Sequence, residues 1–505
     1  MPTLELSSSP LAESDADAVI VTAFEDGLSP AAGEADAALG GLLVEMREAK
    51  EFRGRFAERP VIHTLGRLPA RRLLVLGLGK RDQLDAFRLH NAFQFAGTTL
   101  RKQGVRRLAA HADPATVAAL GNGSPASAAD VARAVVTGLL LGNFEGDLNK
   151  SEREPDPGIE RIELAGLDGD EVALRQALGE AEVLAGASNQ VRTWAAAPSN
   201  TLTPRLLAEQ ASALYAGTGL EVEVLQRADL EREGMGALLG VARGSDEPPV
   251  MIVVRHDGGR PDGPRLALVG KGITFDTGGI SLKPAAGMEM MKWDMGGGAA
   301  VLAAMWAIAR LNPRANVIGV VPATENMPGG RAYKPGDVLV SKSGKTIEVT
   351  NTDAEGRIIL ADGLAKAREL GATHLVDVAT LTGACVVALG HVASGLMTND
   401  RDLGRMVEDA AALAGDRVAE LPLHPEYDVA LRSDVADMKN AAGREAGAIT
   451  AAVFLREFVG DVPWVHLDIA GPVWNDQGDM TVIPKGPTGT PVRTFVHLAR
   501  AFAEL

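Results

Sequence analysis

The chain has a single cysteine, Cys385, among its 505 residues, so no disulfide can form within it. Aromatic residues make up only 4%, and the cores must therefore be built mainly from Ala, Val, Leu and Ile. No apolar run reaches the roughly 20 residues of a membrane-spanning helix. The segment Met1–Pro10 is polar and rich in serine, unlike the apolar core of a secretion signal. These absences predict a protein of a reducing compartment, and we expect it in the cytoplasm and not at a membrane.

Positive charge is also scarce, because the formal net charge is -16 at pH 7. An acidic balance disfavours nucleic acids and anionic membranes as partners, since both repel a negative surface. The main basic cluster consists of Arg101, Lys102, Arg106 and Arg107, for which a solvated helix end is the simpler interpretation. An additional DNA-binding or regulatory role is therefore kept only as an alternative function.

The nine histidines include no His-Glu-x-x-His pattern. This excludes the helix-borne zinc site found in many peptidases. His466 lies in an apolar segment that predicts a buried strand, so we expect a structural role for it.

Strand-like apolar runs alternate with helical patterns along the whole chain, which is typical of α/β proteins with largely parallel sheets. We predict an N-terminal α/β domain over 1–168, a connecting helix over 169–196, and a larger C-terminal α/β domain over 197–505 with a mixed, largely parallel central sheet. The first domain should contain a strand at Ala18–Phe24 and a helix at Ala32–Glu48. The strands expected in the second are Val250–Arg255, Arg265–Val269, Val317–Val321, Thr346–Val349, His374–Val378 and Trp464–Ile469.

The segment Asn351–Ile358 places two carboxylates and a guanidinium within five residues. The oxygens of Asp353 and Glu355 can converge on one divalent ion or bridge two, and Arg357 can hold an oxyanion. A competing interpretation is a helix-capping box, in which Thr352 and Glu355 cap a helix that continues to Leu370. The segment alone does not decide between the two.

A second group of polar residues follows the strand predicted at Arg265–Val269. Lys271 and Asp276 come just beyond its carboxyl end, where ligand sites lie in open α/β sheets. Lys283 and Asp294 follow nearby, and Asp294 could equally cap the helix that starts after it. The glycines around Lys271 lack the full pattern of a nucleotide-binding loop, so nucleotide binding is not expected.

Taken in order, these segments resemble the leucyl aminopeptidase family of dinuclear metallopeptidases, also called cytosol aminopeptidases. The resemblance covers the whole second domain and is weaker over the first. The matching motifs are Val269–Gly279, Met291–Gly297, Asn351–Arg357, Ala379–Ala384, Ala448–Ala452 and His466–Gly471.

The resemblance implies a role for each matching residue. Two divalent metal ions would be bound by Lys271, Asp276, Asp294, Asp353 and Glu355. Lys283 and Arg357 would be catalytic, with Arg357 holding a bicarbonate, and Met291, Thr380 and Gly383 would lie near the substrate. The family also implies a macro-like fold for the N-terminal domain and a homohexamer that admits short peptides with a free N-terminus.

Charge counting supports this ligand set, because four carboxylates balance two divalent ions. Without metal, such crowded carboxylates would repel one another and some would take up protons. Oxygen ligands with one amine fit Zn, Mn or Mg, so the metal is left open. The predicted function is a metal-dependent exopeptidase of broad specificity that prefers Leu-like N-terminal residues.

Overall fold

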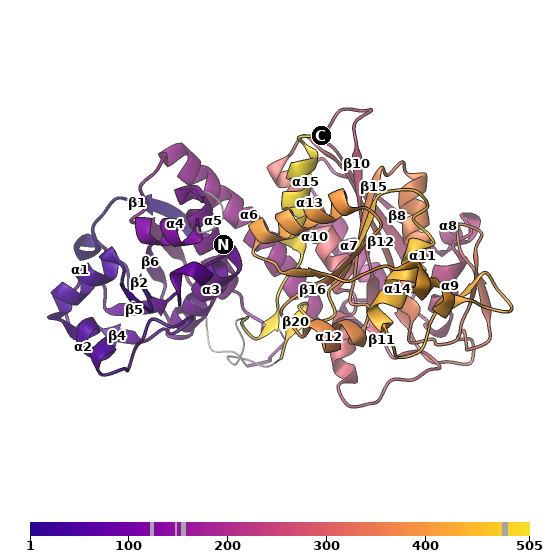
Figure 1. Ribbon diagram of the computed structural model, residues 1–505, viewed down its shortest axis with the longest axis horizontal. Helices are drawn as coiled ribbons and strands as arrows, with labels where there is room; N and C mark the ends of the chain where they lie inside the picture. The colour runs from indigo at the N-terminus through magenta and orange to yellow at the C-terminus, as the bar shows by residue number, and fades with distance from the viewer. Residues whose placement is uncertain (122–125, 147–148, 153–157, 477–482) are drawn as a thin grey trace. The chain divides into compact units, whose positions relative to one another are not determined.

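The computed structural model describes residues 1–505 except 122–125, 147–148, 153–157 and 477–482 (Figure 1). The chain forms two compact units, one holding Met1–Asn189 and the other Gln190–Asp476 and Lys485–Leu505. One helix, α6 (Glu171–Ala196), runs over most of the segment expected to connect the domains. The division into 1–168, 169–196 and 197–505 itself stays a prediction.

The first unit is built on a sheet with helices on both faces. Its strand order is β1-β7-β6-β2-β5-β4, and all neighbours are parallel except β4 and β5; β3 (Gly27–Leu28) pairs with β2 outside this order. The strands are Thr3–Ser7 (β1), Arg161–Ala165 (β7), Arg107–His111 (β6), Ala18–Phe24 (β2), Arg72–Gly77 (β5) and Val61–His63 (β4). Its helices are Pro30–Leu39 (α1), Leu42–Glu48 (α2), Ala86–Lys102 (α3), Pro114–Leu120 (α4) and Ala128–Gly142 (α5).

Two separate apolar cores lie against the two faces of this sheet. One includes buried residues of α3 and α5, and the other includes those of α1 and α2. The single helix predicted over Ala32–Glu48 is wrong, because the chain breaks it into α1 and α2. Gly40 and Gly41 adopt φ values of 77° and 87° at the break, a left-handed conformation that ends a helix and that glycine adopts without strain.

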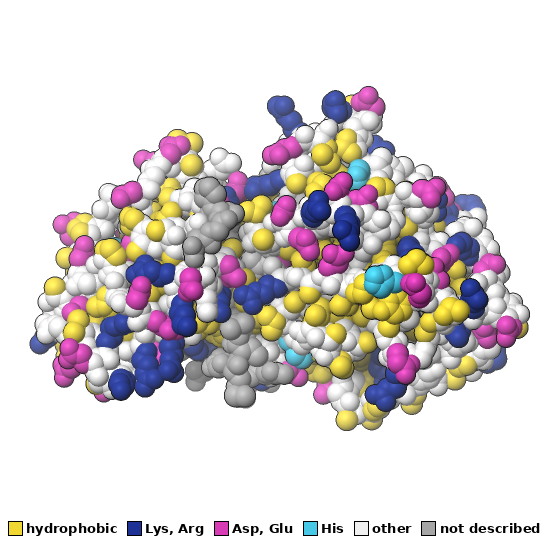
Figure 2. Space-filling model, viewed as in Figure 1, with side chains coloured by type: hydrophobic (Ala, Val, Ile, Leu, Met, Phe, Trp, Pro, Cys, Tyr) yellow, Lys and Arg dark blue, Asp and Glu magenta, His cyan; other side chains and the backbone are white. Residues whose placement is uncertain are grey.

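Two of the four residues in the basic cluster of the first unit pair with nearby acidic groups. Arg106 pairs with Glu160, and Arg107 contacts Asp15 and Asp17 at 3.1 Å each. Figure 2 shows basic side chains interspersed with acidic ones on the visible face. This arrangement offers little support for the alternative DNA-binding role.

The second unit is built on a nine-stranded sheet, and this sheet is mixed, as the sequence predicts. Its strand order is β17-β16-β19-β15-β10-β12-β9-β8, and β11 pairs with β12. The pairs β16–β19, β12–β9 and β9–β8 are antiparallel, while β19, β15, β10, β12 and β11 run parallel to one another. The bounds are Val418–Glu420 (β17), Ser394–Thr398 (β16), Trp464–Asp468 (β19), His374–Ala379 (β15), Arg265–Gly270 (β10), Asn316–Asn326 (β12), Val250–Asp257 (β9), Glu221–Leu225 (β8) and Gly272–Asp276 (β11).

Five of the six strands predicted for this domain belong to that sheet. The sixth, observed as β14 (Thr346–Glu348), pairs instead with β13 (Val338–Val340) and β18 (Met438–Lys439) in a small separate sheet. The prediction of a strand was right, but the sequence gives no sign of its partners.

Helices cover both faces of the large sheet. α11 (Glu355–Glu369) packs on β10 and β12, and it also contacts α9 (Gly236–Val241) and α14 (Gly447–Arg456). Apolar residues of these three helices belong to one core. α10 (Gly296–Leu311) packs on the same strands and contacts α15 (Val492–Phe502), which contacts α13 (Arg401–Ala414). α10 approaches β15 so closely at Gly297 that an added Cβ would lie 2.2 Å from the carbonyl oxygen of Val378. This contact fixes the start of α10, and with it the residues just before the helix. The remaining helices of this unit are α7 (Pro204–Leu214), α8 (Arg227–Arg232) and α12 (Gly383–Leu389).

Candidate active site

The predicted site residues gather at the carboxyl edge of the central parallel strands. Lys271 follows β10, Asp276 ends β11, and Thr380 follows β15. Glu355 begins α11, and Asp294 precedes α10. Parallel strands expose their carboxyl ends along one edge, so residues more than 100 positions apart meet there.

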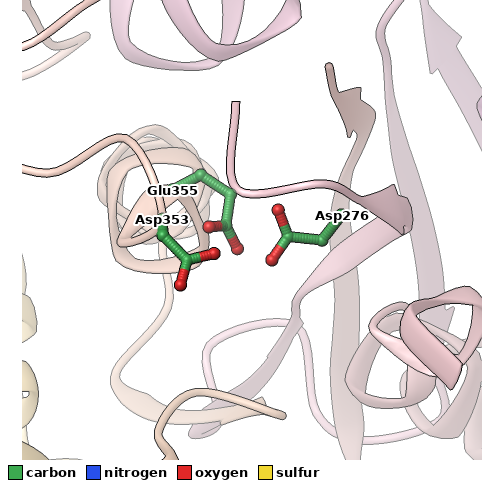
Figure 3. A group of neighbouring side chains, drawn as sticks. All are labelled: Asp276, Asp353 and Glu355. Atoms are coloured by element: carbon green, nitrogen blue, oxygen red, sulfur yellow. The ribbon is translucent and has the colours of Figure 1, made fainter. Parts of the chain in front are cut away.

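Three carboxylates converge at this edge (Figure 3). One oxygen of each of Asp276, Asp353 and Glu355 lies within 4.8 Å of the other two. Asp276 and Glu355 are buried, each with 2% of the residue exposed, and Asp353 is partly exposed. Such a group of oxygens can bind a divalent cation, since carboxylates are preferred ligands of hard and borderline ions.

Two lysines bind the carboxylates in two groups. Lys283 Nζ contacts Asp353 and lies 2.8 Å from Oδ2 of Asp276. Lys271 Nζ lies 2.7 Å from Oδ2 of Asp294 and 2.8 Å from Oε1 of Glu355. Glu355 therefore belongs both to the three-carboxylate cluster and to the group around Lys271.

The donor set fits divalent cations. Oδ2 of Asp294 and Oδ1 of Asp353 are buried and accept no hydrogen bond within the described residues, although a lysine Nζ lies close to each. Four acidic side chains and one amine at this edge match the neutral charge count of two divalent ions. The residues present thus suit the metal site that the sequence predicts.

The carboxylates compete for limited positive charge. Burial raises the pKa of Asp294 to about 8; Lys271 opposes this shift, and the neighbouring Glu355 and Asp276 add to it. Burial likewise raises the pKa of Asp353 to about 6 against the opposing charge of Lys283. Glu355 behaves differently, because Lys271 and Lys283 overcome its burial and lower its pKa.

The metal-free protein should become less stable as the pH rises from 5 to 8. The pKa of aspartate is about 3.9 in an unfolded chain, so the folded protein alone holds a proton on Asp353 up to a pH of about 6 and on Asp294 up to a pH of about 8. A proton bound only by the folded state stabilises it, and this contribution is lost as the pH rises through the folded pKa values of about 6 and about 8. Thermal melting of chelator-treated protein at the two pH values measures the effect.

The variant Asp294→Asn isolates this contribution. Asp362 is also buried, with a pKa raised to about 7, and adds a slope of the same sign in both proteins. The fall in melting temperature from pH 5 to 8 should therefore be smaller in Asp294→Asn than in the wild type. Equal falls would contradict the assignment of the raised pKa to Asp294.

The two capping interpretations are wrong. α11 begins at Glu355, and its N-cap residue, Ala354, provides no side-chain cap. Thr352 instead donates to the carbonyl of Gly278 at 2.6 Å and accepts from the amide of Ser281 at 2.7 Å, so it holds the loop that precedes Lys283. α10 is likewise uncapped by a side chain, and Oδ1 of Asp294 accepts a hydrogen bond from Thr380 Oγ1 at 2.6 Å.

Arg357 lies in the first turn of α11, with 7% of the residue exposed. Its Nη1 donates to the carbonyl of Asn440 at 3.0 Å, and its Nε is buried with no hydrogen-bond partner in the described part of the chain. Burial lowers the pKa of Arg357 to about 10, although the charges of Glu355 and Asp468 oppose this shift. The guanidinium remains charged at neutral pH.

The residues expected near the substrate lie on three segments. Thr380 contacts Asp294 directly, Gly383 is the first residue of α12, and Met291 belongs to a short 3-10 helix, Met288–Trp293. The last residue of that helix, Trp293, stacks on Trp474 with ring centroids 4.5 Å apart.

Sequence reasoning missed two asparagines that organise the site. Asn440 Oδ1 accepts from the amide of Thr350 at 2.8 Å, and its Nδ2 donates to the carbonyl of Asn351 at 2.6 Å. Asn326, the last residue of β12, donates to Asp276 and to the carbonyl of Thr352. Neither lies in a recognisable motif, because each acts on residues 26 to 90 positions away.

Comparison with known proteins agrees with this geometry. Residues 189–496 match the catalytic domain of the cytosol aminopeptidase family, and residues 20–153 match its N-terminal domain. The chain belongs to the cytosol aminopeptidase family. It is 45% identical to the probable cytosol aminopeptidase of Solibacter usitatus over 497 residues, covering 98% of each chain. The corresponding protein of Alkaliphilus metalliredigens is 44% identical over 469 residues, covering 92% of each.

Solved structures of related enzymes share the two-domain fold. A mutant of tomato leucine aminopeptidase superposes with a TM-score of 0.87 at 32% identity, covering 99% of this chain and 97% of its own. The bottromycin maturation enzyme BotP in complex with Mn gives a TM-score of 0.82 at 34% identity, covering 97% and 100%. Membership in the cytosol aminopeptidase family makes this chain a hydrolase, a metal-dependent aminopeptidase that acts on peptides. Among the described residues, no helix combines the length and apolarity needed to cross a bilayer.

Proposed function

We propose that this cytosol aminopeptidase binds two divalent ions and releases N-terminal residues, preferably Leu-like ones, from short peptides. The ligands would be Lys271, Asp276, Asp294, Asp353 and Glu355. The observation that carries the proposal is that Glu355 lies in both ligand groups, within 4.8 Å of Asp276 and Asp353 at one side and 2.8 Å from Lys271 at the other. A carboxylate that belongs to both groups would suit a pair of adjacent ions.

Bound ions at such a site supply Lewis acidity and a water of lowered pKa. The side chains must then position the peptide and stabilise the charge that develops. Lys283, placed between Asp276 and Asp353, would donate to the oxyanion that forms on the scissile carbonyl. The charges of Asp276, Glu355 and Asp353 raise the pKa of Lys283 against its burial, which favours the ammonium form needed for this role.

Arg357 would hold the proton carrier. Asp276, Asp294, Asp353 and Glu355 would all be engaged as ligands, so none of these four would be free to act as general base. We propose that the Arg357 guanidinium would hold a bicarbonate, which would supply a proton acceptor and donor near the scissile bond. A buried guanidinium suits this role, since its charge is poorly screened by solvent.

The substrate would enter with its first side chain near Met291, Thr380 and Gly383. An apolar pocket distinguishes residues that differ by one methylene by only about 1–3 kcal/mol, so broad specificity around leucine is expected. We further propose Zn or Mn, with Mg as a third possibility, as the bound ions, and a homohexamer in the cytoplasm. The complex of BotP with Mn supports Mn as one candidate.

The requirement for a free α-amine tests the proposed exopeptidase activity. Leucine p-nitroanilide should be hydrolysed, and its N-acetyl derivative should be hydrolysed at least about 100-fold more slowly, because the acidic ligand set and its ions are arranged to bind an amine. Release of p-nitroaniline measures both rates under the same conditions. Comparable rates for the two substrates would contradict an aminopeptidase and point to an endopeptidase.

A further inference from the structure

We infer that Asn326 is a positioning residue that determines which carboxylate oxygens of Asp276 and Glu355 face the metal ions. The inference rests on the proposed two-metal function and extends it to a residue outside the ligand set. Asn326 is fully buried at the end of β12, in register with Asp276 on β11. Its side-chain amide is therefore adjacent to the proposed metal ligands Asp276 and Glu355.

The Asn326 amide nitrogen contacts three acceptors. Nδ2 lies 2.8 Å from Oδ1 of Asp276, 3.0 Å from the carbonyl oxygen of Thr352 and 3.4 Å from Oε2 of Glu355. An ionised carboxylate and a backbone carbonyl can only accept hydrogen bonds. The chemistry of the acceptors therefore fixes the orientation of the amide, with Nδ2 towards the ligands.

These contacts divide the oxygens of each carboxylate into two kinds. Oδ1 of Asp276 accepts from Asn326 and also from the amide of Gly278 at 2.8 Å. Its Oδ2 is left for Lys283, and Oε1 of Glu355 is left for Lys271, each at 2.8 Å. These two oxygens, which Asn326 does not contact, are the ones that face positive charge. Asn326 thus turns the second oxygen of each ligand towards the cations.

The surroundings of Asn326 hold its side chain in this orientation. Its backbone carbonyl accepts from the amide and hydroxyl of Thr277 at 2.9 Å and 2.8 Å. Its Oδ1 is buried without a hydrogen-bond partner in the described residues and faces Gly279, where an added Cβ would lie 2.8 Å away. An apolar residue of the same size would avoid this unpartnered oxygen. The value of asparagine here must therefore lie in what Nδ2 does.

Cobalt binding tests the inference without relying on activity. Co²⁺ is titrated into chelator-treated protein, and its visible absorption reports affinity and ligand geometry. Asn326→Ala and the apolar Asn326→Leu should each bind Co²⁺ about 10- to 100-fold more weakly, with an altered spectrum, as expected when the hydrogen bonds that orient metal ligands are lost. Asn326→Asp should also change the Co²⁺ affinity and spectrum, in a way distinct from the other two variants, because it replaces the amide donor with a fifth carboxylate.

Asn316 provides a matched control at the other end of the same strand. It is also a buried asparagine, and its Nδ2 donates to the carbonyl of Arg260 at 2.6 Å. Asn316→Ala should lower the melting temperature but leave Co²⁺ affinity and spectrum unchanged. Either Asn326→Ala or Asn326→Leu, shown to be folded by circular dichroism, suffices for the comparison.

The outcomes separate this inference from the proposed function. Wild-type affinity and spectrum in a folded Asn326 variant would overturn the inference while leaving the metal site intact. A wild-type protein that binds no Co²⁺ would overturn the proposed function and the inference with it. Equal weakening in Asn316→Ala would also overturn the inference, because it would reduce the effect to general loss of stability.

Discussion

Treatment with a chelator will abolish the hydrolysis of leucine p-nitroanilide, lowering the rate by at least about 100-fold. The reason lies in the chemistry of the side chains. Lys271 and Lys283 pair with the carboxylates, and none of these groups can act as the Lewis acid that lowers the pKa of a water. Adding back Zn²⁺, Mn²⁺ or Mg²⁺ one at a time should restore the rate, and the order of recovery will identify the preferred ion.

Two controls make this result specific to the metal. Chelator premixed with an excess of the restoring ion should not inhibit, and the far-ultraviolet circular dichroism spectrum should be unchanged by chelation. The second expectation follows from the lysines, which keep the carboxylates paired without an ion. Full activity in protein shown to be metal-free by elemental analysis would reject the metal mechanism.

Replacing either proposed catalytic cation, as Lys283→Ala or Arg357→Ala, should lower kcat by about 100-fold and change KM little. Lys283→Ala would remove the interaction with the oxyanion, and Arg357→Ala would remove the guanidinium that we propose to bind bicarbonate. In addition, Arg357→Ala should no longer respond to added bicarbonate. Steady-state kinetics together with the metal content of each variant distinguish loss of catalysis from loss of ligands.

Matched controls exist for both substitutions. Lys345 forms a half-exposed ion pair with Glu457, and Arg368 lies on the same helix as Arg357 and donates to the carbonyl of Phe458. Lys345→Ala and Arg368→Ala should keep wild-type kcat. If Lys283→Ala or Arg357→Ala did the same, its proposed catalytic role would be wrong.

The sequence predicts well both the fold and which residues come together at the site, because both depend on local patterns. Strand-like runs such as Ala18–Phe24 end where apolar periodicity ends, and the observed β2 has the same bounds. Lys271 and Asp276 could be placed at a strand's carboxyl end because that position follows from chain direction alone. The family resemblance then brought Asp294, Asp353 and Glu355 to the same edge, and the structure places them there.

What the sequence could not predict depends on pairing between distant segments. Thr352 fits a capping box by spacing, but the loop at Gly278–Ser281 offers it better partners than the helix does. Asn326 meets Asp276 only because β11 and β12 pair in a register that periodicity does not specify. The start of α10 is set by a backbone contact between Gly297 and β15, and no capping pattern in the sequence indicates this contact.

One consequence of the fold concerns movement within the site. Glu355 and Arg357 lie in the first turn of the same buried helix, α11, two residues apart. Their backbones are therefore separated by about 3 Å along the helix axis and cannot shift independently. If Glu355 binds an ion and Arg357 holds the bicarbonate, as we propose, a displacement of α11 that moved one of these residues would also move the other. Ion binding and proton transfer would then both depend on the position of the same turn of helix.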